Sequence, residues 1–98
     1  MAAYDWIVIG GGFTGAALGY ELAKQGLEVL LLEGDRGLDN ATRYSYGGLA
    51  YWSGREPLER QLCAEGIAIH RQLAQELDAD TEFRELSLLL TVERSPIP

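Results

Sequence analysis

The sequence predicts an α/β fold that starts with a strand–helix–strand unit. A short apolar run at residues 4–9 leads straight into the glycine-rich turn of residues 10–15, and a second apolar run occupies residues 27–32. Nearly continuous apolar runs are typical of parallel strands that are covered on both faces. Between the two runs, residues 14–25 are rich in helix formers, and Gly26 follows as a C-terminal stop. This order of elements predicts a Rossmann-like unit.

The glycine-rich turn has the pattern that places a phosphate at a helix N-terminus. Gly10 would make the tight turn, Gly12 would let the main chain approach a pyrophosphate, and Gly15 would let the helix pack closely on the strand. The alternative is that these glycines serve helix packing alone. Because strand, helix and strand follow in the required order, the sequence favours a dinucleotide site.

An acidic residue at the end of the second apolar run completes this pattern. Glu33 follows the first glycine by roughly 20 residues, the separation that brings a carboxylate beside the ribose hydroxyls of a bound dinucleotide. A carboxylate in that place repels a 2′-phosphate. The sequence therefore predicts binding of FAD or NAD rather than NADP.

Length and composition limit the function classes. The chain has 98 residues, 47% of them hydrophobic, which allows one domain with a packed core. Its net charge of −7 disfavours nucleic-acid and anionic-membrane partners. The single Cys63 excludes an intrachain disulfide, and one histidine with one cysteine makes no metal-ligand pattern. The N-terminal apolar run is too short for a signal peptide or a membrane span, so we expect a cytoplasmic protein.

A loop and a long amphipathic helix are expected after the first unit. Residues 34–53 are irregular because glycines and polar residues break any period. Ser53 and Glu56 have the spacing of a capping box, and Pro57 suits the first helical turn. An apolar stripe then predicts one buried helix face. The stripe consists of Leu58, Leu62, Ile69, Leu73 and Leu77.

The last part of the chain is expected to be extended. Residues 81–93 predict one strand or a tight pair of strands that meet near Ser87. We therefore expect a Rossmann-like unit in residues 1–80 and the start of a second sheet in residues 81–98. Two parallel strands with one crossover leave both edges of a sheet open, so the chain is expected to be an incomplete domain, a piece of a longer enzyme or a self-associating product.

Three stretches carry a resemblance to a known family. Residues 5–23, from Asp5-Trp6-Ile7 through the glycine-rich turn, and residues 26–33 resemble the N-terminus of FAD-dependent oxidoreductases of the D-amino-acid oxidase and glycine oxidase type. Residues 41–49, Ala-Thr-Arg-Tyr-Ser-Tyr-Gly-Gly-Leu, are similar to the second flavin-contacting segment of that family. The resemblance covers essentially the whole chain and selects FAD over NAD.

The resemblance also implies roles for individual residues. The pyrophosphate would be held by Gly10, Gly12, Phe13, Thr14 and Gly15, with the adenosine ribose on Glu33. The flavin side would be lined by Thr42, Arg43, Ser45, Gly47, Gly48 and Leu49. Some relatives attach the flavin covalently to a histidine in this second segment, where this chain has Tyr46. The resemblance therefore implies non-covalent FAD.

Two classes of function follow from these observations. The first is the FAD-binding part of an oxidoreductase that moves a hydride from the carbon beside an amine nitrogen to flavin N5, with an amine or amino acid as substrate of the full-length enzyme. No residue here can be named as catalytic, and we expect the chain alone to be inactive; His70 and Cys63 lie on the helix, away from the flavin segments. The alternatives are a catalytically silent, self-associating module without flavin and an NAD-binding unit.

Overall fold

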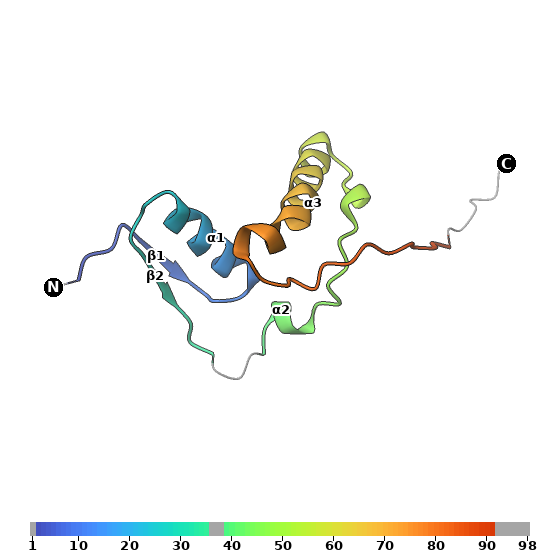
Figure 1. Ribbon diagram of the computed structural model, residues 1–98. Helices are drawn as coiled ribbons and strands as arrows, with labels where there is room; N and C mark the ends of the chain where they lie inside the picture. The colour runs from blue at the N-terminus through green and yellow to red at the C-terminus, as the bar shows by residue number, and fades with distance from the viewer. Residues whose placement is uncertain (1, 36–38, 92–98) are drawn as a thin grey trace. The chain divides into compact units, whose positions relative to one another are not determined.

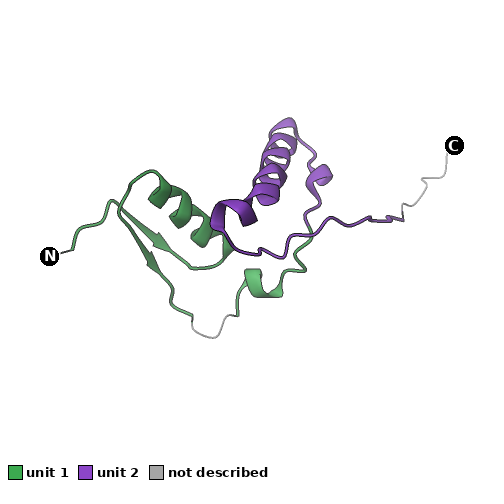
Figure 2. Ribbon diagram, viewed as in Figure 1, with its two compact units in different colours: residues 1–48 green, residues 49–98 purple. Residues whose placement is uncertain are grey.

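The computed structural model describes residues 2–35 and 39–91 (Figure 1). Along the chain its elements are β1 (Trp6–Ile9), α1 (Phe13–Lys24), β2 (Val29–Leu32), α2 (Ala41–Tyr44), the 3-10 helix η1 (Tyr51–Ser53) and α3 (Pro57–Leu77). They group into two compact units, Met1–Gly48 and Leu49–Pro98, which are coloured separately in Figure 2 and described separately below. The division expected at residues 1–80 and 81–98 stays a prediction.

The first unit is a strand–helix–strand unit with parallel strands, as the sequence predicts. β1 and β2 pair in register from Trp6 opposite Val29 to Ile9 opposite Leu32. The ladder continues into the glycine-rich turn, where the Gly10 N–H donates to the Leu32 carbonyl at 2.7 Å. Parallel strands need a crossover connection between them, and α1 supplies it. The Rossmann-like start of the fold is therefore present.

Helix α1 ends where a glycine permits the chain to turn back. Gly26 has a φ of 82°, a left-handed conformation that side chains other than glycine rarely adopt. Its N–H donates to the Ala23 carbonyl at 3.0 Å, and the Leu27 N–H donates to the Leu22 carbonyl at 3.4 Å. These two bonds form a Schellman motif, which satisfies the last helical carbonyls and delivers the chain into β2.

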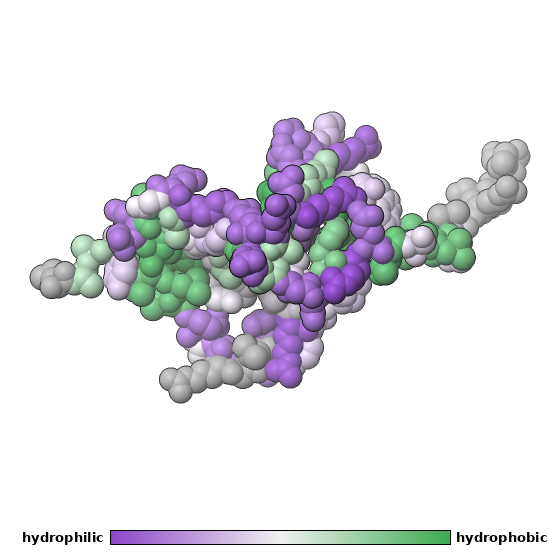
Figure 3. Space-filling view, in the orientation of Figure 1, coloured by the Kyte–Doolittle hydropathy of each residue, from purple (hydrophilic) through white to green (hydrophobic). Residues whose placement is uncertain are grey.

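The core of the first unit lies between α1 and one face of the sheet. Val8, only 6% exposed, is covered by the helix, whereas its neighbours Ile7 and Ile9 are 56% and 85% exposed. Successive strand residues point to opposite faces, so this alternation means that one face is covered and the other open. Figure 3 shows apolar side chains gathered over the two strands. The expectation of strands covered on both faces is thus not met within the first unit, where α1 is the helix that packs on the two strands and it covers one face.

The N-cap of helix α3 lies three residues after the expected cap, Ser53. The N-cap is Glu56, which forms a capping box with Glu59, and Pro57 lies in the first turn as predicted. The Glu59 carboxylate accepts from the N–H groups of Arg55 at 2.9 Å and Glu56 at 3.4 Å. Ser53 instead lies in η1, where its hydroxyl donates to the Ala50 carbonyl at 2.7 Å. The expected Ser53–Glu56 box is therefore wrong, because the next acid three residues on completes the box that forms.

The covered face of α3 is also not the expected one. Leu58, Leu62 and Ile69 are 65%, 58% and 54% exposed, and Leu77 is exposed as well. The half-buried positions form the neighbouring stripe of Cys63, Gly66, Ile67, His70, Leu73 and Ala74. Phe83 stacks against His70 with 6.4 Å between ring centroids, so the segment after the helix covers this stripe.

None of the helices in residues 2–35 and 39–91 has the length and apolar character needed to traverse a bilayer.

The described residues 79–91 form no strand. They follow the left-handed C-cap Asp78, and an ion pair of 3.1 Å between Arg71 and Glu85 joins the segment to α3. A strand needs backbone partners, and no such pairing is present in this described stretch, so the expectation of one or two strands is not met there. Val92 and Glu93, the last residues of the expected strand region, lie outside the described residues.

Candidate dinucleotide site

The glycine-rich turn between β1 and α1 depends on two of its glycines for its shape. Gly10 has a φ of 105°, which makes the sharp turn out of the strand. A Cβ on Gly15 would collide with the carbonyl of Gly10 and would lie 3.5 Å from Val8 Cγ1. Gly15 therefore lets the first turn of the helix lie directly against the turn that precedes it. The structure thus has a tight turn at Gly10 and a close backbone approach at Gly15, while the roles of both glycines in cofactor binding stay predictions.

The N-terminus of α1 presents backbone N–H groups at this turn. The first bond within the helix runs from the Ala16 N–H to the Gly12 carbonyl at 2.9 Å, so the N–H groups of the three preceding residues have no acceptor in the helix itself. The Phe13 N–H donates to Thr42 Oγ1 at 2.8 Å. Among the described residues the N–H groups of Thr14 and Gly15 have no acceptor. Such donors, at the positive end of a helix dipole, favour an anion.

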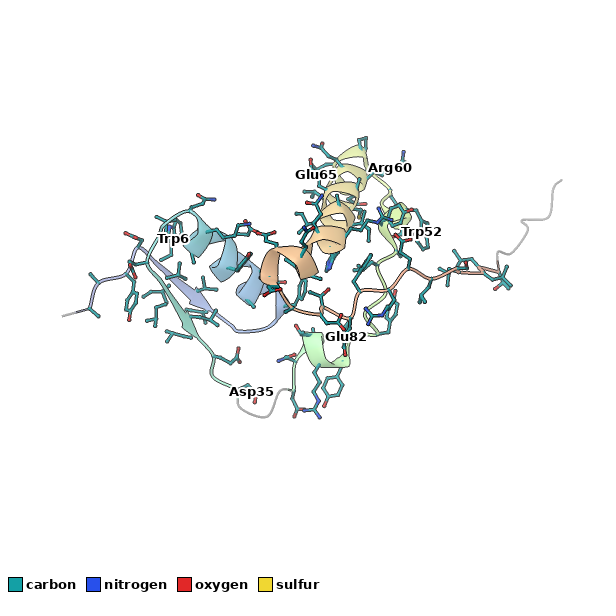
Figure 4. All side chains as sticks on the ribbon, in the orientation of Figure 1. Trp6, Asp35, Trp52, Arg60, Glu65 and Glu82 are labelled. Carbon is teal, nitrogen blue, oxygen red and sulfur yellow. The ribbon has the colours of Figure 1, made fainter. Side chains whose placement is uncertain are left out.

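Glu33 lies at the carboxyl end of β2, beside the turn. Its carboxylate accepts from the N–H of Gly11 through Oε2 and from the N–H of Asp35 through Oε1 at 3.1 Å. Asp35 is labelled in Figure 4, where it follows the end of the strand. These two bonds fix the position of the carboxylate at the edge of the glycine-rich turn. A carboxylate has about four acceptor positions, so it keeps acceptor capacity for a ligand.

Gly11 belongs to this candidate site although the sequence analysis did not single it out. Besides donating to Glu33, it leaves little space: a Cβ on Gly11 would lie 3.1 Å from Glu33 Oε2 and 3.3 Å from Glu33 Cβ. A larger residue would press on the carboxylate. The signal for this role was available, because the turn has three successive glycines where the dinucleotide pattern leaves the middle position open.

Thr42 connects residues 41–49, the segment similar to the family's second flavin-contacting segment, to the glycine-rich turn. Its hydroxyl accepts from the Phe13 N–H, and a Cβ on Gly12 would lie 3.1 Å from the same oxygen. Thr42 lies in the four-residue helix α2, within a stretch expected to be irregular. The helix forms there because Asn40 caps it, accepting from the Arg43 N–H at 3.0 Å.

The remaining residues of the second segment make local contacts. Gly47 has a φ of 74°, and its N–H donates to Ser45 Oγ at 3.2 Å. A Cβ on Gly48 would collide with the ring of Tyr46. Leu49 belongs to the second unit. In the part of the chain that the structure describes, no hydrogen bond joins Ser45, Gly47 or Gly48 to the glycine-rich turn, and their flavin-side roles stay predictions.

One ionisable group in this segment, the Tyr44 phenol, has a shifted pKa. The Tyr44 hydroxyl donates to Asp39 Oδ1 at 2.7 Å. This bond to the carboxylate, followed by desolvation, raises the pKa of the Tyr44 phenol above its ordinary value. Tyr44 is therefore a hydrogen-bond donor at neutral pH, and its bond supports the chain on either side of Thr42.

The groups considered for other chemistry lie in the second unit. His70 and Cys63 are half-buried on α3, and His70 stacks on Phe83. Residues 2–35 and 39–91 contain no group of three or more His, Cys, Asp or Glu side chains that could hold a metal ion. The expectation that this chain has no metal site stays a prediction.

Comparison with known families agrees with this geometry. A profile of the FAD dependent oxidoreductase (DAO) family matches residues 5–96, nearly the entire chain. The chain belongs to this family. Comparison with curated proteins found no match, and comparison with solved structures found none either. As a member of an FAD-dependent family, the chain carries its glycine-rich turn, Glu33 and the second segment in the order expected for a flavoprotein.

Proposed function

We propose that this chain binds FAD non-covalently, as the cofactor-binding part of an oxidoreductase that acts on an amine or an amino acid. The observation that carries the proposal is the pair of Thr14 and Gly15 N–H groups without acceptors among the described residues, next to the carboxylate of Glu33. Donors for a pyrophosphate and an acceptor for ribose hydroxyls thus meet at one turn. The family match supports FAD as the dinucleotide.

Each part of the site has a task in this proposal. The backbone of Gly10, Gly12, Phe13, Thr14 and Gly15 would hold the pyrophosphate, and Glu33 would bind the ribose through the acceptor positions that Gly11 and Asp35 leave. Residues Thr42, Arg43, Ser45, Gly47, Gly48 and Leu49 would line the flavin side. The glycines of the turn support this fit. A Cβ on Gly15 would collide with the backbone, and a residue with a side chain at position 10 would have a strained backbone.

The cofactor carries the redox chemistry, and this chain supplies binding and orientation. When bound, FAD accepts a hydride from the carbon beside the amine nitrogen of the substrate. Tyr46, in the place where some relatives have a covalently bound histidine, supports non-covalent attachment, because a phenol there replaces the imidazole that forms the link. No residue of this chain is proposed as an acid, a base or a substrate-binding group.

A second candidate is a self-associating module that holds no flavin. The open face of the sheet, where Ile7 and Ile9 are exposed, favours association with another copy of the chain.

We further propose that the protein has neither nucleic acid nor membrane as partner, since its net charge is −7. We also propose that it works in the cytoplasm, where its single cysteine stays reduced.

Titration with FAD separates these candidates. We expect the purified chain to quench flavin fluorescence saturably and to elute from gel filtration with FAD absorbance, while NADH and NADPH cause no saturable change. Glu33→Ala should lower FAD affinity about tenfold or more, because a hydrogen bond to a charged group is lost. A colourless chain that does not respond to FAD would contradict the proposal. Unchanged affinity of Glu33→Ala would contradict the ribose role of this residue alone.

A further inference from the structure

A strained hinge joins α3 to the segment that covers it. The hinge is residues 78–82, and the segment is residues 83–91. Asp78 has a φ of 50° and Glu82, labelled in Figure 4, has a φ of 60°; among the described residues other than glycine, only these two have a positive φ. A left-handed backbone is unfavourable for residues with a side chain, and aspartate tolerates it better than glutamate. The hinge is therefore strained at both of its ends, and more so at Glu82.

The hinge also contains a buried hydroxyl without a partner. Thr81 Oγ1 is closed off from solvent and makes no hydrogen bond among the described residues. A buried polar group that lacks a partner is destabilising, because it has lost its bonds to water. The Asp80 carboxylate opposes these costs by accepting from the Glu82 N–H at 2.8 Å and from the Arg84 guanidinium at 3.4 Å. If the hinge straightened, both strained residues would leave the left-handed region and the hydroxyl would meet water.

Side chains hold the segment beyond the hinge to α3. Phe83 stacks on His70 with the ring planes inclined by 16°, and Glu85 Oε1 accepts from Arg71 Nε at 3.1 Å. In the described part of the chain, no backbone hydrogen bond joins residues 83–91 to the helix. The same segment of another copy of the chain offers the same side chains to α3.

We infer that residues 83–91 are exchanged between two copies of this chain, so that the segment of each copy lies on α3 of the other. In this exchanged dimer the ring stack and the ion pair form between copies instead of within one. These contacts are the same in both arrangements, so the hinge decides between them. Straightening the hinge relieves its strain and hydrates its hydroxyl, and these gains oppose the entropy that is lost on association.

The exposed surface of the segment also suits a second copy. Its leucines are 59% to 93% exposed, and no strand pairing is present in the described residues of the segment. These leucines are Leu86, Leu88, Leu89 and Leu90. In a twofold dimer the two straightened hinges run antiparallel, an arrangement in which extended backbones bond to each other. The inference does not depend on FAD binding.

Hinge variants test the strain, by light scattering after gel filtration at a series of protein concentrations. Glu82→Gly removes the strain and should raise the dissociation constant of the dimer about tenfold, whereas Glu82→Ala keeps the strain without the carboxylate and should dimerise like the wild type. Thr81→Val removes the unpartnered hydroxyl and should also weaken the dimer. A monomeric wild type, or equal dissociation constants for Glu82→Gly and Glu82→Ala, would overturn the inference.

Mixed dimers test which contacts join the copies. Arg71 and Glu85 are 49% and 72% exposed, so their charges can be reversed without disturbing a core. Arg71→Glu and Glu85→Arg each place like charges opposite one another, in the monomer and in the exchanged dimer of either variant. When the two variants are unfolded together in urea and refolded, only the mixed exchanged dimer has opposite charges at both positions. Native mass spectrometry should find it about five times as abundant as the two parent dimers together, where chance pairing gives equal amounts.

The matched control is the double variant Arg71→Glu/Glu85→Arg mixed with the wild type. Each of these chains keeps its ion pair in its own dimer, and the mixed exchanged dimer has like charges at both positions, so it should be about fivefold rarer than by chance. Association through the open face of the sheet gives chance amounts in both mixtures, because residues 71 and 85 then stay paired within each chain. Chance amounts in either mixture would overturn the inference.

Discussion

At the residue scale, two glycines of α1 illustrate how differently the same residue type can be required. A Cβ on Gly15 would collide with the Gly10 carbonyl, whereas a Cβ on Gly19 would lie at an ordinary 3.9 Å from Val29 Cγ1. Neither residue has the left-handed φ that favours glycine, which among the described glycines occurs at Gly10, Gly26 and Gly47. The difference between the two positions is therefore one of space alone.

This contrast gives a prediction for two matched variants. Gly15→Ala should destabilise the chain by about 1–3 kcal/mol, because the backbone of the turn has to move away from the new methyl group. Gly19→Ala should stabilise it by about 0.5–1 kcal/mol, since alanine loses less backbone entropy in a helix. Urea unfolding followed by circular dichroism measures both. Equal unfolding midpoints for the two variants would contradict the close contact between Gly15 and the Gly10 carbonyl.

At the element scale, the start of α3 depends on a carboxylate rather than on the serine expected as its cap. Glu59 accepts from the N–H groups of Arg55 and Glu56. These hydrogen bonds, that to Arg55 first, hold the pKa of the Glu59 carboxyl below its ordinary value. Because the folded-state pKa is lower than that of the unfolded chain, Glu59 adds stability at neutral pH, and this contribution is lost as the pH falls through the folded-state pKa.

Variants at Glu59 separate its charge from its hydrogen bonds. Glu59→Gln keeps an acceptor for the cap but does not titrate, so its unfolding midpoint should fall less between pH 7 and pH 3 than that of the wild type. Glu59→Ala should lower the midpoint of α3 unfolding at neutral pH, because two N–H groups lose their acceptor. Midpoints measured in urea at a series of pH values provide the comparison. A wild-type pH dependence in Glu59→Gln would contradict the role of the carboxylate.

At the scale of the whole molecule, features set by neighbouring residues were predicted correctly, whereas features that depend on residues far along the chain were not. The turn at Gly10 and the stop at Gly26 each act within a few residues, and the strand–helix–strand unit was predicted correctly from them. Of the residues expected in the covered stripe of α3, Leu73 alone is half-buried, because the covered stripe faces Phe83, a residue outside the helix. The cap of α3 was misplaced, since two acids three residues apart offer overlapping boxes.

The candidate site divides in the same way. The roles of Gly10 and Gly15 in shaping the turn follow from the spacing of the motif alone. The bond between Gly11 and Glu33 and that between Phe13 and Thr42 join residues 22 and 29 positions apart, which spacing does not predict. The strands expected in residues 81–93 needed a pairing partner, and the described residues offer none. Sequence patterns thus identify the elements of this chain, while their partners require the structure.

The open face of the sheet leads to a last prediction, on the association state. Ile9 is 85% exposed in β1, opposite Leu32 in the parallel register, so its side chain can change without disturbing the Val8 core. If this face associates with another copy, light scattering after gel filtration should give a mass above the 10.8 kDa of one chain. Ile9→Thr keeps a β-branched residue in the strand but makes it polar, and should shift the mass toward the monomer, whereas Ile9→Val should not. A monomeric wild type, or equal masses for the two variants, would show that the apolar side chains of the open face do not mediate self-association.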